Sequence, residues 1–171
     1  MELIENYLKG GDLRSIGEVA KLVPLIKHQA DFDELFAQMS SADRRIAMRA
    51  ADAAEKISAL QPNFLTKHKA AILALLDHSK YIELKWHVSQ LIPRLTLNQV
   101  ELIKVWSKLT AWVMDGSESK IVRVNALQAM ADLNRGDAKL AAELTHLFDT
   151  VEKEGMPSLV ARIRKLRLKQ Q

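Results

Sequence analysis

Residues 117–133 read S-E-S-K-I-V-R-V-N-A-L-Q-A-M-A-D-L. Apolar residues recur here every three or four positions, which predicts an amphipathic helix with a single cation, Arg123, early in the apolar run. Related strings around Arg49, Lys85 and Arg162 also place a cation after an apolar residue, and the four cations are 36, 38 and 39 positions apart. A period near 38 residues predicts stacked helical pairs, because one pair alone cannot bury its apolar faces.

Turn residues and apolar stripes divide the remaining sequence into further helices. Asp31 with Glu34, and Asn98 with Glu101, have the spacing of helix-capping boxes. Pro93 implies a kink in the last turn of its helix. We expect helices over residues 2–9, 12–28 (kinked at Pro24), 32–39, 43–60, 64–76, 80–95, 98–114, 117–133, 138–153 and from 158 onward.

The repeat pattern over roughly residues 12–170 resembles HEAT and armadillo-type repeats. Asp43 precedes Arg49 by six positions, as a turn Asp commonly precedes an Arg in the second helix of HEAT repeats, and the string L-V-P-L-I at 22–26 resembles a proline-kinked first helix. The resemblance implies an all-α, right-handed α–α superhelix, a solenoid of about four HEAT-like pairs used as a binding surface. We expect a single domain over 1–171, with a short helix and turn at 1–11 and helical pairs over 12–170.

The composition limits the class of protein. The chain lacks Cys, so disulfides, thiolate metal sites and Cys nucleophiles are excluded. It contains no run of about 18 apolar residues, and its first residues do not have the pattern of a signal peptide. We therefore expect no membrane association and a cytoplasmic location. The net charge of +4 is modest, and cations are concentrated in the last ten residues.

The sequence offers little for catalysis. None of the five His residues lies three or four positions from another, and phosphate-loop and serine-hydrolase motifs are absent. Glu143 with His146, and Glu83 with His87, are more typical of polar surface than of metal ligands. We expect no enzyme activity and no cofactor. The best enzyme alternative is a resemblance to HEAT-like DNA glycosylases, which combine a basic concave face with aromatic side chains, but no Asp is placed beside Trp86.

The cations of the second helices are the remaining functional signal. In a solenoid these helices tend to line the concave face, where a row of cations attracts acidic peptides or phosphates. The leading hypothesis is a non-catalytic scaffold that binds a protein or peptide partner on its concave face. The alternative is nucleic-acid binding through the same basic stripe. Trp106 and Trp112 lie on the apolar stripe of their helix, so we expect them to pack in the core. The candidate partner-binding residues are Arg45, Arg49, Lys85, Trp86, Arg123, Arg162 and Arg164.

Overall fold

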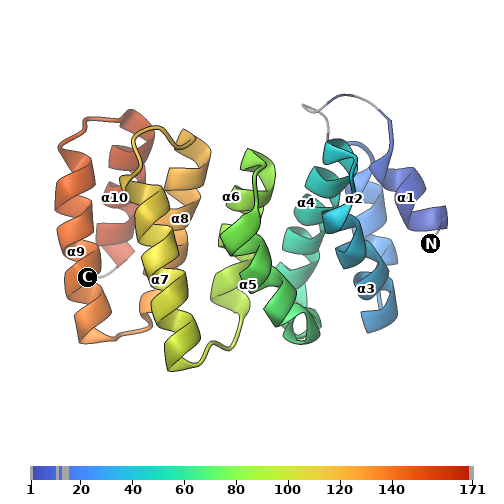
Figure 1. The fold of residues 1–171 in the computed structure, drawn as a ribbon, viewed down its shortest axis with the longest axis horizontal. Coiled ribbons are helices and arrows are strands. Elements are labelled where there is room, and N and C mark those ends of the chain that lie inside the picture. Colours follow the sequence, from blue (N-terminus) through green and yellow to red (C-terminus); the bar gives the residue numbers. More distant parts are fainter. Residues whose placement is uncertain (1, 11, 13–15, 170–171) are drawn as a thin grey trace. The chain divides into compact units, whose positions relative to one another are not determined.

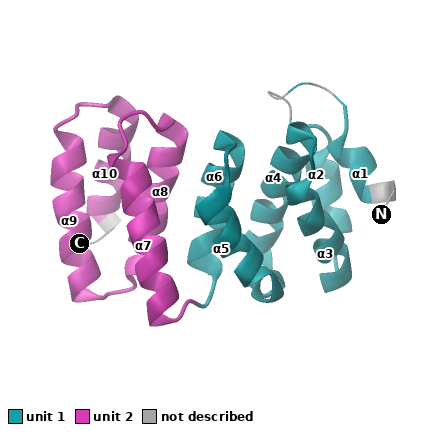
Figure 2. Ribbon diagram, viewed as in Figure 1, with its two compact units in different colours: residues 1–96 teal, residues 97–171 magenta. Residues whose placement is uncertain are grey.

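The computed structural model describes residues 2–10, 12 and 16–169, and the regular elements in these ranges are all helical (Figure 1). The chain divides into two compact units, Met1–Thr96 and Leu97–Gln171 (Figure 2). None of the helices in these described ranges is long and apolar enough to span a membrane. Because the regular elements of the described residues are helices, the all-α prediction is confirmed.

Unit 1 is built around one long helix, α4, which packs against α1, α2, α3 and α6. Asp43 caps this helix, as its carboxylate accepts a hydrogen bond from the backbone N–H of Arg45 at 2.8 Å. Small side chains on α4, including Ala50 and Ala53, are fully buried and let the neighbouring helices approach closely. The α-helices of unit 1 are α1 (Glu2–Leu8), α2 (Val19–Leu22), α3 (Gln29–Ala37), α4 (Arg44–Leu60), α5 (Lys69–His78) and α6 (Ile82–Leu91).

The prolines of unit 1 coincide with short 3-10 helices rather than with kinks inside long helices. These are η1 (Val23–Leu25), η3 (Pro62–His68) and η4 (Ile92–Arg94), while η2 (Gln38–Ser40) extends α3. Proline lacks the N–H that continues an α-helix, so the tighter turns begin beside it. The expected helix over 12–28 is correspondingly confined to 19–25, although residues 13–15 lie outside the described residues.

The start of α3 differs from the sequence prediction. The helix begins at Gln29 with His28 as its N-cap, so Asp31 is the third residue of the helix and not its cap. The Asp31 carboxylate accepts hydrogen bonds from the backbone N–H groups of His28 at 2.9 Å and Lys27 at 3.1 Å. These bonds lower the pKa of Asp31, because they favour its charged form. The predicted pairing of Asp31 with Glu34 is wrong because the helix starts earlier.

Unit 2 consists of α7 (Gln99–Met114), α8 (Lys120–Asn134), α9 (Ala138–Glu152) and α10 (Pro157–Lys169). The predicted capping box of α7 is confirmed: Glu101 N–H donates to the Asn98 side chain, and Asn98 N–H donates to the Glu101 carboxylate. Helix α8 packs against α7 and α10, and α10 also packs against α9. Trp106 and Trp112 are buried as expected, together with Leu109, Leu127, Leu144, Phe148 and Ile163.

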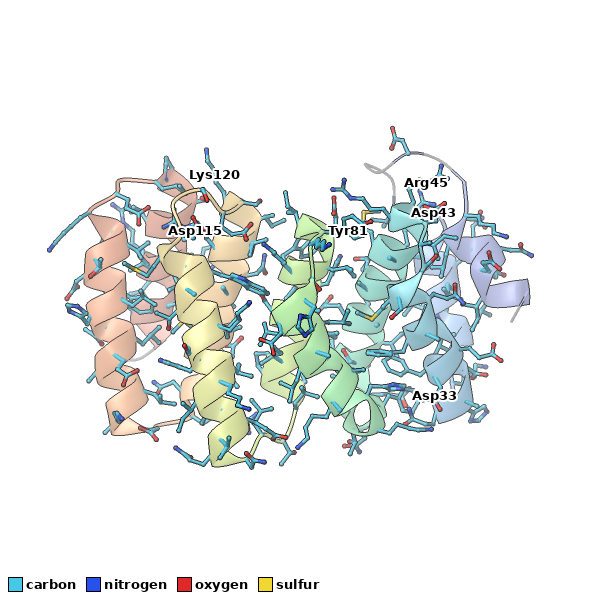
Figure 3. The ribbon with its side chains drawn as sticks, in the orientation of Figure 1. Asp33, Asp43, Arg45, Tyr81, Asp115 and Lys120 are labelled. Atoms are coloured by element: carbon cyan, nitrogen blue, oxygen red, sulfur yellow. The ribbon has the colours of Figure 1, made fainter. Side chains whose placement is uncertain are left out.

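Polar contacts within unit 1 link positions that are 34 to 39 residues apart. Arg44 forms a bidentate ion pair with Glu83, 39 residues away, with nitrogen–oxygen distances of 2.9 to 3.2 Å. Arg94 donates to the Glu55 carbonyl, again 39 residues away, and to the Ser58 hydroxyl. Asp33 of α3 (labelled in Figure 3) binds Lys67 at 2.5 Å. The two separations of 39 residues equal one of the spacings between the sequence cations, whereas Asp33 and Lys67 are 34 residues apart.

Candidate functional site

Arg49 lies in the interior of unit 1 with an exposed fraction of 0%. Its guanidinium donates hydrogen bonds to the backbone carbonyls of Leu8 (2.7 Å), the last residue of α1, and of Gly10 and Asp12 (3.0 Å), which follow it. A buried guanidinium needs such acceptors, because an unpaired buried charge is costly. Arg49 therefore fixes the chain after α1 and has no surface to offer a partner in this structure.

Arg123 has the equivalent role in unit 2 and is also 0% exposed. Its Nε donates to the Val113 carbonyl near the end of α7 at 2.8 Å. Its Nη2 donates to both carboxylate oxygens of Glu154, each at 2.8 Å. Arg123 thus joins α8 to the end of α7 and to the segment between α9 and α10. The expected surface stripe of cations does not include Arg49 or Arg123.

Two of the remaining candidate cations, Arg45 and Arg162, are bound by side chains of their own unit. Arg45 is exposed but pairs with Asp43 at 3.0 Å, and the two side chains lie together at the start of α4 (Figure 3). This hydrogen bond lowers the pKa of Asp43 to about 2. Arg162 is half-buried and donates to the Gln128 side chain at 2.7 Å. Arg164 is exposed on α10.

Lys85 and Trp86 lie on α6 and are both half-buried. The Trp86 ring contacts the imidazole of its neighbour His87, with ring centroids 3.5 Å apart. His87 itself is only 1% exposed. Burial, with a smaller contribution from the positive charge of Lys56, lowers the pKa of His87 to about 3. His87 is therefore a neutral interior group and does not pair with Glu83, which binds Arg44.

Unit 2 contains a groove that was not predicted from the sequence. It lies between α7 and α9 and consists of two adjoining cavities of about 410 and 330 Å³. Trp106, Thr110 and Glu143 line both cavities, so the two form one continuous groove. Gln99 and Asp137 line one end, which places the N-terminal ends of the two helices together.

The walls of this α7–α9 groove are mostly apolar. Ile103 of α7 is 60% exposed, whereas Trp106 is 6% exposed. Met130 of α8 also lines the groove. Helix α7 packs on α8, and α9 packs on α8 and α10, but α7 and α9 are not closely packed on each other, which leaves the groove between them. The other apolar lining residues are Leu102, Met114, Leu140 and Leu147.

Polar side chains lie along the α9 side of the groove. Glu143 is exposed and forms no ion pair with any described residue, although Lys139 lies one turn before it and lines the same groove. The Asp137 carboxylate is occupied, because it caps α9 by accepting from the N–H groups of Lys139 and Leu140. His146 completes this side and is exposed. Glu143 is therefore the carboxylate available at the middle of the groove.

One sequence signal could have located the groove. Val100, Ile103 and Met114 fall outside the apolar stripe that predicted the buried face of α7, yet all three are large apolar residues. A helix with apolar side chains beyond its buried stripe presents a second apolar surface. The helix that forms the other wall of the groove could not be predicted from the sequence, because α9 lies about 40 positions away from α7.

The titratable side chains of the groove are the candidates for metal ligands or acid–base groups. Within the described ranges there is no cluster of three or more His, Asp or Glu side chains that could hold a metal ion. Glu143 and His146 line the same cavity, but no third ligand joins them. Comparisons with models of known families, with curated proteins and with solved structures found no match to this chain.

Proposed function

We propose that this chain is a non-catalytic helical-repeat protein that binds another protein through the α7–α9 groove. The observation that carries the proposal is the exposed apolar surface of α7 beside this groove. Isolated apolar residues are common on protein surfaces, but a continuous apolar groove with polar groups at its edge is typical of an interaction site. Ile103, at the centre of this surface, is 60% exposed.

The finer architecture is part of the same proposal. We infer a HEAT-like solenoid of about four helical pairs, and the support is the sequence period near 38 together with the contacts 39 residues apart in unit 1. In that arrangement α7 and α9 are first helices of their pairs. The proposed binding surface then lies on the side of the first helices. The sequence had instead suggested that the partner binds on the side of the second helices. A cytoplasmic location is proposed on the absence of Cys.

Nucleic-acid binding is less well supported. Binding to phosphates depends on several accessible cations on one surface. Of the candidates, Arg49 and Arg123 are buried, Arg45 pairs with Asp43, and Arg162 binds Gln128. A glycosylase role has similarly little support, because Trp86 is half-buried against His87.

The test is affinity capture with matched surface variants. The intact chain and the variants Ile103→Glu and Leu168→Glu would serve as baits after nuclease treatment. Leu168 is 71% exposed on α10 and lies outside the groove, so it is the control for adding one acid to an apolar site. We expect a partner that is retained by the intact chain and by Leu168→Glu but lost with Ile103→Glu. Equal retention by all three baits would refute the groove as the binding surface.

A further inference from the structure

The shape of the α7–α9 groove selects the kind of segment that fits it. The residues at α9 that line the groove extend from its N-cap, Asp137, to Thr150. This distance corresponds to about 20 Å at 1.5 Å per residue. Both walls are helices that run along the groove, since Gln99 lies at the same end as Asp137 and Met114 at the same end as Thr150. A third helix of about 13 residues matches this length.

Backbone hydrogen bonding also favours a helix over an extended peptide. The N–H and C=O groups in the middle of α7 and α9 are bonded within those helices, so the walls offer a strand no backbone partners. An extended segment in an apolar groove would leave its own polar groups unpaired, which costs free energy. A helix satisfies these groups internally and places apolar side chains at i, i+4 and i+7 against the groove.

The charge of the groove selects a further feature of the occupant. Glu143 lines both cavities, is exposed, and forms no ion pair with any residue in the described ranges. Of the other charged side chains in the lining, Asp137 caps α9 and Lys139 lines only one of the two cavities, so Glu143 is the charged group common to both. When an occupant covers the apolar wall, the Glu143 carboxylate loses part of its hydration. A cation from the occupant would compensate for this loss, whereas a second carboxylate there would be repelled.

We propose that the α7–α9 groove binds an amphipathic helix that carries a Lys or Arg beside the middle of its apolar stripe, opposite Glu143. This inference rests on the proposed function and names the chemistry of the partner segment. Trp106, at the junction of the two cavities, is the apolar anchor, and Glu143 sets the register and the charge preference.

The test uses two synthetic helical peptides of 18 residues that differ at one feature. Both carry Leu at i, i+4, i+7 and i+11, and one has Lys while the other has Glu at the two positions beside the middle of this stripe. Binding to the intact chain is measured by fluorescence anisotropy of the labelled peptides. We expect the intact chain to bind the Lys peptide about fivefold more tightly, with a smaller preference at high salt.

Two variants of the chain complete the experiment. Glu143→Lys should reverse the preference, so that the Glu peptide binds more tightly. Asp132→Lys adds the same charge to α8, at an exposed residue outside the groove lining, and should keep the original order. Circular dichroism confirms that each variant is folded before it is compared.

Four results would overturn the inference, three of them from the peptide experiment. These are equal affinity for the two peptides, an unchanged order with Glu143→Lys, and no binding of either peptide by the folded chain. A fourth is a homodimer in sedimentation that Ile103→Glu dissociates, because a second copy would then occupy the groove. If the peptides fail while Ile103→Glu still loses a captured partner, the inference fails and the proposed function stands.

Discussion

Lowering the pH from 7 to 5 should destabilise unit 1 through His87, and replacing this residue should remove most of the effect. His87 has a pKa of about 3 in the folded chain because it is buried, against 6.5 for a solvated His. Below pH 6.5 the unfolded chain binds a proton that the folded chain does not. The free energy of unfolding is therefore little affected by His87 above pH 6.5, and it decreases as the pH falls from 6.5 towards 3.

The size of the effect follows from these two pKa values. Proton linkage gives a loss of about 2 kcal/mol in the free energy of unfolding between pH 7 and pH 5. The depressed pKa of Asp33, lowered to about 2 mainly by the hydrogen bond from Lys67, contributes only in more acidic solutions. The interval from pH 7 to pH 5 thus separates the imidazole from this carboxylate.

The assay is urea unfolding followed by circular dichroism at several pH values. The variant His87→Phe should be less stable at pH 7, because the larger ring overpacks this buried site, but its stability should vary much less between pH 7 and pH 5. His78→Gln changes an exposed His and should keep the pH dependence of the unaltered chain. NMR titration gives the direct readout: an imidazole of His87 that titrates near pH 6.5 in the folded chain would refute the reasoning.

Three other substitutions test the roles of two buried arginines, Arg49 and Arg123, and of the exposed Arg164. Gly17→Ala should cost about 1 kcal/mol or more, because Gly17 has a φ of +59° and an added Cβ would lie 3.2 Å from the Arg49 guanidinium; unchanged thermal stability would contradict this. Arg123→Met should cost about 3 kcal/mol in urea unfolding, because the Val113 carbonyl loses its donor, whereas a loss below about 0.5 kcal/mol would show that the buried guanidinium is dispensable. Arg164→Glu should leave stability within about 0.5 kcal/mol and change weak retention on DNA only slightly; abolition of salt-resistant retention would favour nucleic-acid binding instead.

Much of the helical framework could be predicted because its signals are local. The caps at Asp43 and Asn98 lie next to the helices they start, and their hydrogen bonds form within three residues. The start of α3 was misplaced because His28 is a weak cap signal. The helix expected over 12–28 was overextended. It begins only after Gly17, whose φ of +59° is not helical, and it changes to a 3-10 turn at Pro24.

The functional residues were harder to predict because their roles depend on distant contacts. The sequence marks Arg49 and Arg123 as regular positions, but burial is decided by carbonyl acceptors such as Leu8 and Val113 on other helices. Ile103 was not predicted as a site residue for a related reason. An apolar residue outside the main stripe becomes part of a groove only when a second helix, here α9, lies beside it without closing the space.

The most direct test of the account is site-specific photo-crosslinking from the α7–α9 groove. A photoreactive amino acid at position 103 is compared with the same group at position 168, and crosslinked residues are identified by mass spectrometry. The account predicts crosslinks from position 103 to one face of a helical segment in a partner protein, and few from position 168. Crosslinks that arise mainly from position 168, or from neither position while the partner remains bound, would contradict it.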